Sequence, residues 1–164
     1  MYQNQRKNKK GKNPAEPIIT AIVVGGVFIL LGVIFVSTPG IFGAIGDLFQ
    51  DFAIIQFPNT GVSLPAPELP WTHTIIYEAA FQFAVGIGIL QIIILAIRLA
   101  VGSSISKISE TIGNLIFWLG AAYLVPTFLN SNTTQSIWFE FWSLLILVVG
   151  ISMIFRGIVI AIKK

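Results

Sequence analysis

Four long apolar stretches, each containing an uninterrupted run of uncharged residues, are the main feature of this chain. In chain order, their uncharged windows run for 30, 19, 29 and 15 residues. A helix needs roughly 20 apolar residues to cross a bilayer core about 30 Å thick. Charges that fall near a helix end can reach the headgroups, so a short window does not exclude a span. The pattern predicts four transmembrane helices, over 18–37, 75–99, 112–129 and 138–162.

Helices are expected because a spanning segment must satisfy its own backbone hydrogen bonds. A transmembrane β-barrel would need segments of about ten residues that alternate in hydrophobicity, and the continuous apolar run at 92–97 does not alternate. The fold class is therefore an all-α integral membrane protein. Pro126 should bend or break the third helix in its last turn.

The one long connection, between the first two spans, carries its own pattern. Pro39 and Gly40 end the first span. Residues 41–55 then place most of their apolar side chains on one side of a helical wheel, with Asp47 and Asp51 on the other. This pattern predicts an amphipathic helix lying in the outer interface. Residues 58–70 are rich in proline and predict a turn followed by an extended strap.

The basic residues define the orientation and the organisation of the chain. With four spans, all ten Lys and Arg residues fall on one side, and most acidic residues fall at or beyond the other. By the positive-inside rule, both termini lie in the cytoplasm and the protein resides in the cell membrane. We expect a basic tail over 1–16 and a single transmembrane domain over 17–164. The first apolar run is too long for a typical signal peptide, so we expect an uncleaved helix.

Composition and residue types narrow the chemistry. Hydrophobic residues make up 55% of the chain and charged residues only 10%, where soluble domains have about 25% charged residues, so a soluble enzyme is excluded. There is no Cys for a disulfide, and His73 is the only histidine. One histidine cannot build a bis-histidine haem or a histidine-based metal cluster, so we expect no cofactor, no metal and no catalytic residues. His73 is interpreted as a solvated cap, and the net charge of +3 gives no reason to expect nucleic acid as a partner.

Small residues recur seven positions apart on the predicted spans. Such a repeat gives each helix a narrow stripe along which another backbone can approach closely. We interpret these stripes as helix-packing positions in a left-handed bundle. The positions are Gly25, Gly32, Ala79, Gly86, Gly113, Gly120, Ser143, Gly150 and Gly157.

Polar residues inside the second span are the best candidates for a functional site. Glu78 and Gln82 share one face of that helix, and Gln91 and Arg98 share nearly the opposite face. Glu78, Gln82 and Gln91 could form a polar pathway for a cation or proton. Alternatively, they supply interhelical hydrogen bonds, which is the commoner role of such residues.

Two further polar features lie at the loops. Glu110 is placed to meet Lys107 or Arg98 at the short connection after the second span. Asn132 begins an N-glycosylation triplet on the predicted outer side.

Two function classes remain. The first is a non-enzymatic subunit, scaffold or assembly component of a membrane complex, with the lipid bilayer and either copies of itself or other membrane subunits as partners. The second is a small oligomeric channel or transporter-like protein that uses the polar residues of the second span. The absence of recognisable catalytic chemistry and the organised outer connection favour the first class.

Overall fold

A computed structural model describes residues 14–57 and 60–162 of the chain. Four of its helices are long and apolar enough to cross a membrane, which confirms the predicted number. They are α1 (Ala15–Ser37), α3 (Thr74–Ala100), α4 (Ile105–Phe128) and α5 (Gln135–Ile162). Most of the predicted basic tail, residues 1–13, lies outside the described residues.

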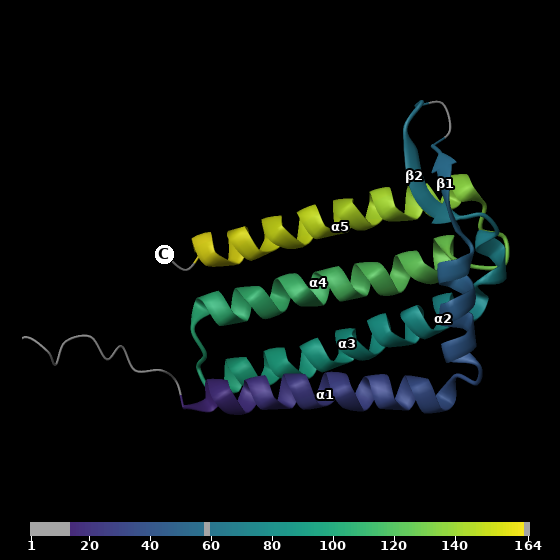
Figure 1. Cartoon of the computed structure of the whole chain (residues 1–164). Coiled ribbons are helices and arrows are strands. Elements are labelled where there is room, and N and C mark those ends of the chain that lie inside the picture. Colours follow the sequence, from purple (N-terminus) through teal and green to yellow (C-terminus); the bar gives the residue numbers. More distant parts are fainter. Residues whose placement is uncertain (1–13, 58–59, 163–164) are drawn as a thin grey trace, which may run out of the picture.

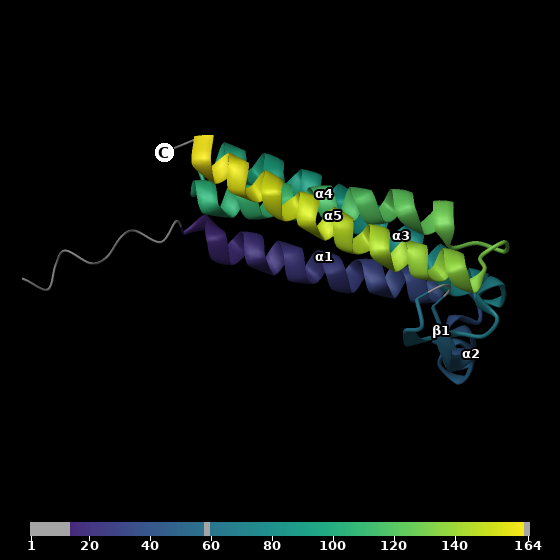
Figure 2. The same ribbon diagram turned by 90° about the horizontal axis from the view of Figure 1, so that it is seen from above.

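The four long helices lie side by side in one layer, in the order α1, α3, α4, α5 (Figure 1). α1 packs on α3, α3 on α4 and α4 on α5, so α1 and α5 form the two edges of the layer. We call the end where α1 begins and α5 ends the terminal end, and the opposite end the hairpin end. Figure 2 shows that the segment between α1 and α3, which includes α2 and β1, projects from one face of the layer. The arrangement is an open row of helices and leaves one side of each edge helix uncovered.

The helices extend further than their apolar windows. α4 begins at Ile105, seven residues before the predicted start, because its first turns are polar but still helical. Within them Ser109 donates to the Ser106 carbonyl at 2.9 Å, and Lys107 pairs with Glu110 at 3.1 Å. α4 also continues through Pro126 to Phe128. Hydropathy therefore located the helices but missed the polar turns at their ends.

The predicted interfacial helix over 41–55 is too long. α2 covers Ile41–Gln50, and the chain then forms strand β1 (Phe52–Gln56). The predicted extended strap contains a second strand, β2 (Ser63–Pro67), and a short 3-10 helix, η1 (Pro70–Thr72). β1 and β2 pair antiparallel, so the segment folds back as a β-hairpin. The β-branched pair at positions 54 and 55 favours a strand over another helical turn.

Asp51 fastens this hairpin to the helix layer. Its Oδ2 atom lies 2.7 Å from His73 Nε2 and accepts the Leu69 N–H at 2.9 Å. His73 is only 4% exposed, so the expectation of a solvated cap is wrong. The hydroxyl of Tyr77, on the first turn of α3, donates to the Pro70 carbonyl at 2.6 Å. These hydrogen bonds hold the segment just before α3 in place through its backbone groups and through the His73 side chain.

The main apolar cluster lies at the hairpin end. It joins the start of α5 to α3, α4 and the hairpin, and Ala66 of β2 is completely buried in it. Trp138 and Phe139 of α5 are also buried there, while no residue in the most apolar window of α5 is buried. The core therefore holds the hairpin onto the start of α5, and the main helix partner of α5 is α4.

Candidate functional site: a polar cavity among α1, α3 and α4

A glycine turn at the terminal end brings α4 back against α3. The N–H of Gly102 donates to the Leu99 carbonyl at 3.3 Å, and the N–H of Ser103 donates to the Arg98 carbonyl at 2.9 Å. This pair of bonds is the Schellman arrangement that closes a helix C-terminus. Gly102 has φ of 64°, the left-handed region that favours glycine. The tight turn places the last turn of α3 beside the first turns of α4.

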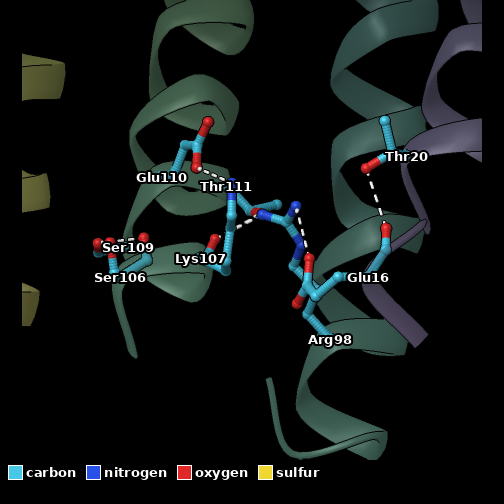
Figure 3. Close-up of polar contacts among 8 residues, drawn as sticks. All are labelled: Glu16, Thr20, Arg98, Ser106, Lys107, Ser109, Glu110 and Thr111. Atoms are coloured by element: carbon cyan, nitrogen blue, oxygen red, sulfur yellow. Dashed lines mark hydrogen bonds and ion pairs between the residues drawn. The ribbon is translucent and has the colours of Figure 1, made fainter. Parts of the chain in front are cut away.

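Arg98 is the centre of the polar contacts that result (Figure 3). One of its terminal nitrogens donates to the Lys107 carbonyl at 2.6 Å and to the Thr111 hydroxyl at 2.5 Å. The Thr111 hydroxyl in turn donates to the Lys107 carbonyl at 3.0 Å. Arg98 is 8% exposed, so it does not reach out into solvent but ties α3 to α4. A buried guanidinium needs such partners, because an unpaired buried charge is costly.

Glu16 adds α1 to this cluster. Its carboxylate lies 3.6 Å from the other terminal nitrogen of Arg98. Glu110 pairs with Lys107, one of its two predicted partners, and not with Arg98. Glu16 Oε1 and Arg98 Nε are buried and have no hydrogen-bond partner in the described part of the chain. The cluster therefore retains unused acceptor and donor capacity.

A polar cavity of about 230 Å³ opens next to these side chains. It lies among α1, α3 and α4, and its lining residues are Thr20, Val23, Gln91, Ile94, Arg98, Lys107, Glu110, Thr111 and Asn114. Gln91 lies nine residues before α3 ends, and Asn114 lies nine residues after α4 begins. At 1.5 Å per residue, both amides are about 14 Å from the terminal end. The cavity thus extends from charged side chains at the terminal end to two amides about a third of the way along α3 and α4.

Close helix contacts lie above the cavity, towards the hairpin end. A Cβ atom built on Gly86 would lie 2.4 Å from Leu30, and one built on Gly26 would lie 3.0 Å from Leu90. These contacts bring the backbones of α1 and α3 together. Between α3 and α4, the rings of Phe83 and Trp118 meet at a centroid distance of 5.4 Å. The cavity is therefore bounded by apolar packing in that direction.

The three residues of the predicted polar pathway do not come together. Glu78 is exposed and lines a different pocket, near Pro126 and Asn130 at the hairpin end. Gln82 is half-buried and lines neither pocket. Gln91 is buried beside Arg98 in the cavity described above. Thirteen helical residues, or about 20 Å, separate Glu78 from Gln91.

The predicted packing positions divide into two groups. Gly86, Gly113 and Gly120 lie where helices meet, since a Cβ atom on each would lie 3.2 Å or less from a neighbouring helix. Ala79 is buried in a small cluster with Ile34 and Ile41. The remaining glycines lie on the edge helices and have nothing among the described residues within 4 Å of an added Cβ atom; all but the half-buried Gly25 are exposed. They are Gly25, Gly32, Gly150 and Gly157.

The last two predicted positions lie at the hairpin end. Ser143 lines a groove between the hairpin and α5, together with Phe139 and Trp142. Asn132 is exposed in the loop between α4 and α5. Its N–H donates to the side-chain oxygen of Asn130 at 2.9 Å, so the backbone there is held in a turn.

Sequence reasoning missed Glu16 and Thr111 as members of the polar cluster. Glu16 was placed in the basic tail, although it begins α1. The available signal was its position as an acid among basic residues, directly before an apolar helix.

Comparison of the chain with protein-family models, with curated proteins and with solved structures finds no match.

Proposed function

We propose that this chain is a non-enzymatic, multi-pass subunit, scaffold or assembly component of a membrane complex. In the proposed orientation the terminal end faces the cytoplasm and the hairpin end faces outward across the cell membrane. The distribution of Lys and Arg supports this orientation. The partner is another membrane helix, supplied by a second copy or by a different subunit.

The observation that carries the proposal is the uncovered small-residue stripe of α5. We call Ser143, Gly150 and Gly157 the α5 stripe. An added Cβ atom at Gly150 or Gly157 would meet nothing within 4 Å. Glycine in a helix interior costs about 1 kcal/mol of stability relative to alanine, and contact with lipid does not compensate for that cost. Packing against a partner helix would compensate for it, because small residues let two backbones approach closely.

The groove at the hairpin end supports the same assignment. It has a volume of about 290 Å³, and Ser143 and Ile146 on α5 face Val62 and Leu64 of the hairpin across it. Ser143 is one heptad above Gly150, so the groove continues the α5 stripe. A helix packed along the stripe would bring its outer end under the hairpin. The hairpin would then limit how far and at what angle that helix can pack.

Substitution of Gly150 tests the proposal. Gly150→Leu should leave the chain folded, because no described residue lies within 4 Å of a Cβ atom added there, but it should block the partner helix. The protein is purified from its own membranes in mild detergent, and its mass and composition are measured by light scattering and mass spectrometry. Wild type should emerge as a symmetric oligomer or with another chain, and Gly150→Leu should emerge alone.

Phe155→Leu is the matched control. Phe155 is 47% exposed and lies five residues further along α5, so it points well away from the stripe. Its substitution should leave the assembly unchanged. A wild-type protein that is monomeric in native membranes, or an assembly that tolerates Gly150→Leu, would refute the proposal.

The polar cavity supports a second candidate, a small oligomeric channel or transporter-like protein. Gln91 and Asn114 face the cavity about a third of the way along α3 and α4 from the terminal end, and no hydrogen bond to either side-chain amide occurs among the described residues. Ion flux into liposomes distinguishes the candidates. If the cavity conducts, Gln91→Leu should abolish flux in a correctly assembled protein. Glu78→Gln should be silent, because Glu78 lies in another pocket.

A further inference from the structure

The two edges of the β-hairpin differ in their hydrogen-bonding capacity. The N–H of Phe57 donates to the Val62 carbonyl at 2.6 Å, and the N–H of Glu68 donates to the Asp51 carbonyl at 2.9 Å. In an antiparallel pair, hydrogen-bonded and non-hydrogen-bonded positions alternate. Positions 51, 53, 55 and 57 of the first strand therefore direct their backbone groups toward β2. Positions 52, 54 and 56 direct theirs to the free edge.

Two prolines close the free edge of β2. Pro65 pairs with Ile54 and Pro67 pairs with Phe52 in the strand register. These are the positions whose backbone groups point away from the partner strand, and proline has no N–H to donate there. Proline on an edge strand is a common way of preventing further strand pairing. An added strand therefore finds little to bond with at β2.

The free edge of β1 has no such protection. Phe52, Ile54 and Gln56 each keep an N–H and a carbonyl, and no partner for these groups occurs among the described residues. The side chain of Ile54 is 72% exposed and that of Phe52 is 40% exposed. The strand carries no charge, so nothing on it repels another strand. β1 thus presents three alternate backbone donors with two exposed apolar side chains.

The position of β1 determines where a partner must come from. The strand order runs along the helix axes (Figure 1). Both strands lie over the start of α5: β2 contacts this helix, and the ring of Phe52 in β1 lies 6.2 Å from that of Trp138, while β1 is the strand nearer the hairpin end. The free edge of β1 therefore faces the hairpin end. A second copy in the same bilayer could not pair its own β1 there, because both edges would face the same way.

We propose that the free edge of β1 is a docking site for an extended segment of a partner protein at the hairpin side. The segment adds as a third, antiparallel strand through the backbones of Phe52, Ile54 and Gln56. It carries apolar side chains at the positions opposite Phe52 and Ile54. Main-chain hydrogen bonds give such strand addition its affinity, and the exposed side chains give it specificity. The site is independent of the α5 stripe and remains even if that stripe faces only lipid.

A peptide with the sequence of β1 serves as the probe, because its own alternate backbone groups match the edge. The peptide Phe-Ala-Ile-Ile-Gln, flanked by lysines and fluorescently labelled, is titrated against the full-length protein in nanodiscs. Amide hydrogen exchange is followed in parallel. Binding should protect the amides of Phe52, Ile54 and Gln56. The amides of Ala53 and Ile55 should already be protected without peptide, because they face β2.

Ile54→Pro removes one donor from the free edge and leaves the ladder to β2 intact, as Pro65 does on the opposite strand. It should weaken peptide binding by up to about tenfold, the loss expected for one main-chain hydrogen bond together with the clash of the added ring. Ile54→Thr keeps the N–H and is the matched control, with binding within about threefold of wild type.

The outcomes decide the proposal in each case. Failure of the wild type to bind the peptide, or equal binding by Ile54→Pro, would overturn it. If Ile54→Pro loses protection at Ala53 and Ile55, the hairpin itself has been disturbed. A peptide N-methylated at alternate residues then replaces that variant, and unchanged binding of the methylated peptide would also overturn the proposal. None of these measurements depends on the oligomeric state that tests the α5 stripe.

Discussion

Single residues at the terminal end determine how α3, α4 and α1 meet. Arg98 donates to two oxygen atoms of α4 and also faces Glu16 of α1, so one side chain contacts three helices. Gly102 makes this possible by turning the chain in the left-handed region. Both residues are unremarkable in the sequence, where an arginine at the end of a span is expected to reach the headgroups.

Gly102→Ala should destabilise the protein by about 1–2 kcal/mol, because an L-residue pays that cost in the left-handed region. The free energy of unfolding in detergent is the measurement. Ser104→Ala is the control in the same connection, since the Ser104 side chain makes no capping hydrogen bond. Equal stability of the two variants would show that the turn is not held in this conformation.

Arg98→Gln should cost more stability than Glu16→Gln. Arg98 loses short, charge-assisted hydrogen bonds, which contribute about 1.5–3 kcal/mol each. The Glu16 pair is long at 3.6 Å, and the Glu16 side chain is 22% exposed, so its loss should cost at most about 1 kcal/mol. Thermal unfolding of both variants tests this order. A larger loss for Glu16→Gln would mean that α1 is held chiefly by this ion pair.

At the scale of elements, glycine positions decide which helix faces are in contact. Gly86 admits Leu30 of α1, and Gly120 admits Val148 of α5. Gly32 and Gly150 follow the same seven-residue spacing but have no neighbour within 4 Å. The same seven-residue spacing of glycines therefore occurs both at contacts between helices of this chain and on helix surfaces without a neighbour.

Gly120→Ala should destabilise the chain by about 1–3 kcal/mol, the usual range for overpacking. A Cβ atom there would lie 2.5 Å from Val148 Cγ1. Adding Val148→Ala should restore part of the loss, and a double-mutant cycle on the unfolding free energy measures that coupling. Gly32→Ala is the control and should be neutral or slightly stabilising. Simple additivity of the two α4–α5 changes would contradict the contact.

At the scale of the whole molecule, the open row of helices places the start of α1 and the end of α5 at one end and the hairpin at the other (Figure 1). The short α3–α4 connection lies at the terminal end, and the α4–α5 loop lies at the hairpin end. In a membrane, each loop is therefore accessible from one side only.

Single cysteines test this arrangement cleanly, because the chain has none of its own. Cysteines at Thr60 and Asn132 should react with a membrane-impermeant reagent from outside intact cells. A cysteine at Ser104 should react only after the membrane is opened. Labelling of the Ser104 position in intact cells would reverse the proposed orientation, and mixed labelling would mean that both orientations exist.

The number and approximate positions of the long helices could be predicted from the amino-acid sequence alone. That result follows from a local property, since uncharged windows of sufficient length can cross a membrane only as helices. The same local information misplaced the end of α2 and missed the hairpin. The pairing of β1 with β2 depends on contacts across the turn and on the anchoring of Asp51 to His73, 22 residues apart.

Which polar and small residues lie together depends instead on how the helices pack. Gln91 and Arg98 share a cavity with Thr20 and Asn114 of two other helices, whereas Glu78, on the same helix, belongs to a separate pocket. Helical spacing gives the face on which a residue lies but not the helix that covers that face. Because the four helices pack as an open row, Gly86, Gly113 and Gly120 of the inner helices lie at helix contacts, whereas Gly32 and Gly150 of the edge helices have no neighbour among the described residues within 4 Å of an added Cβ atom.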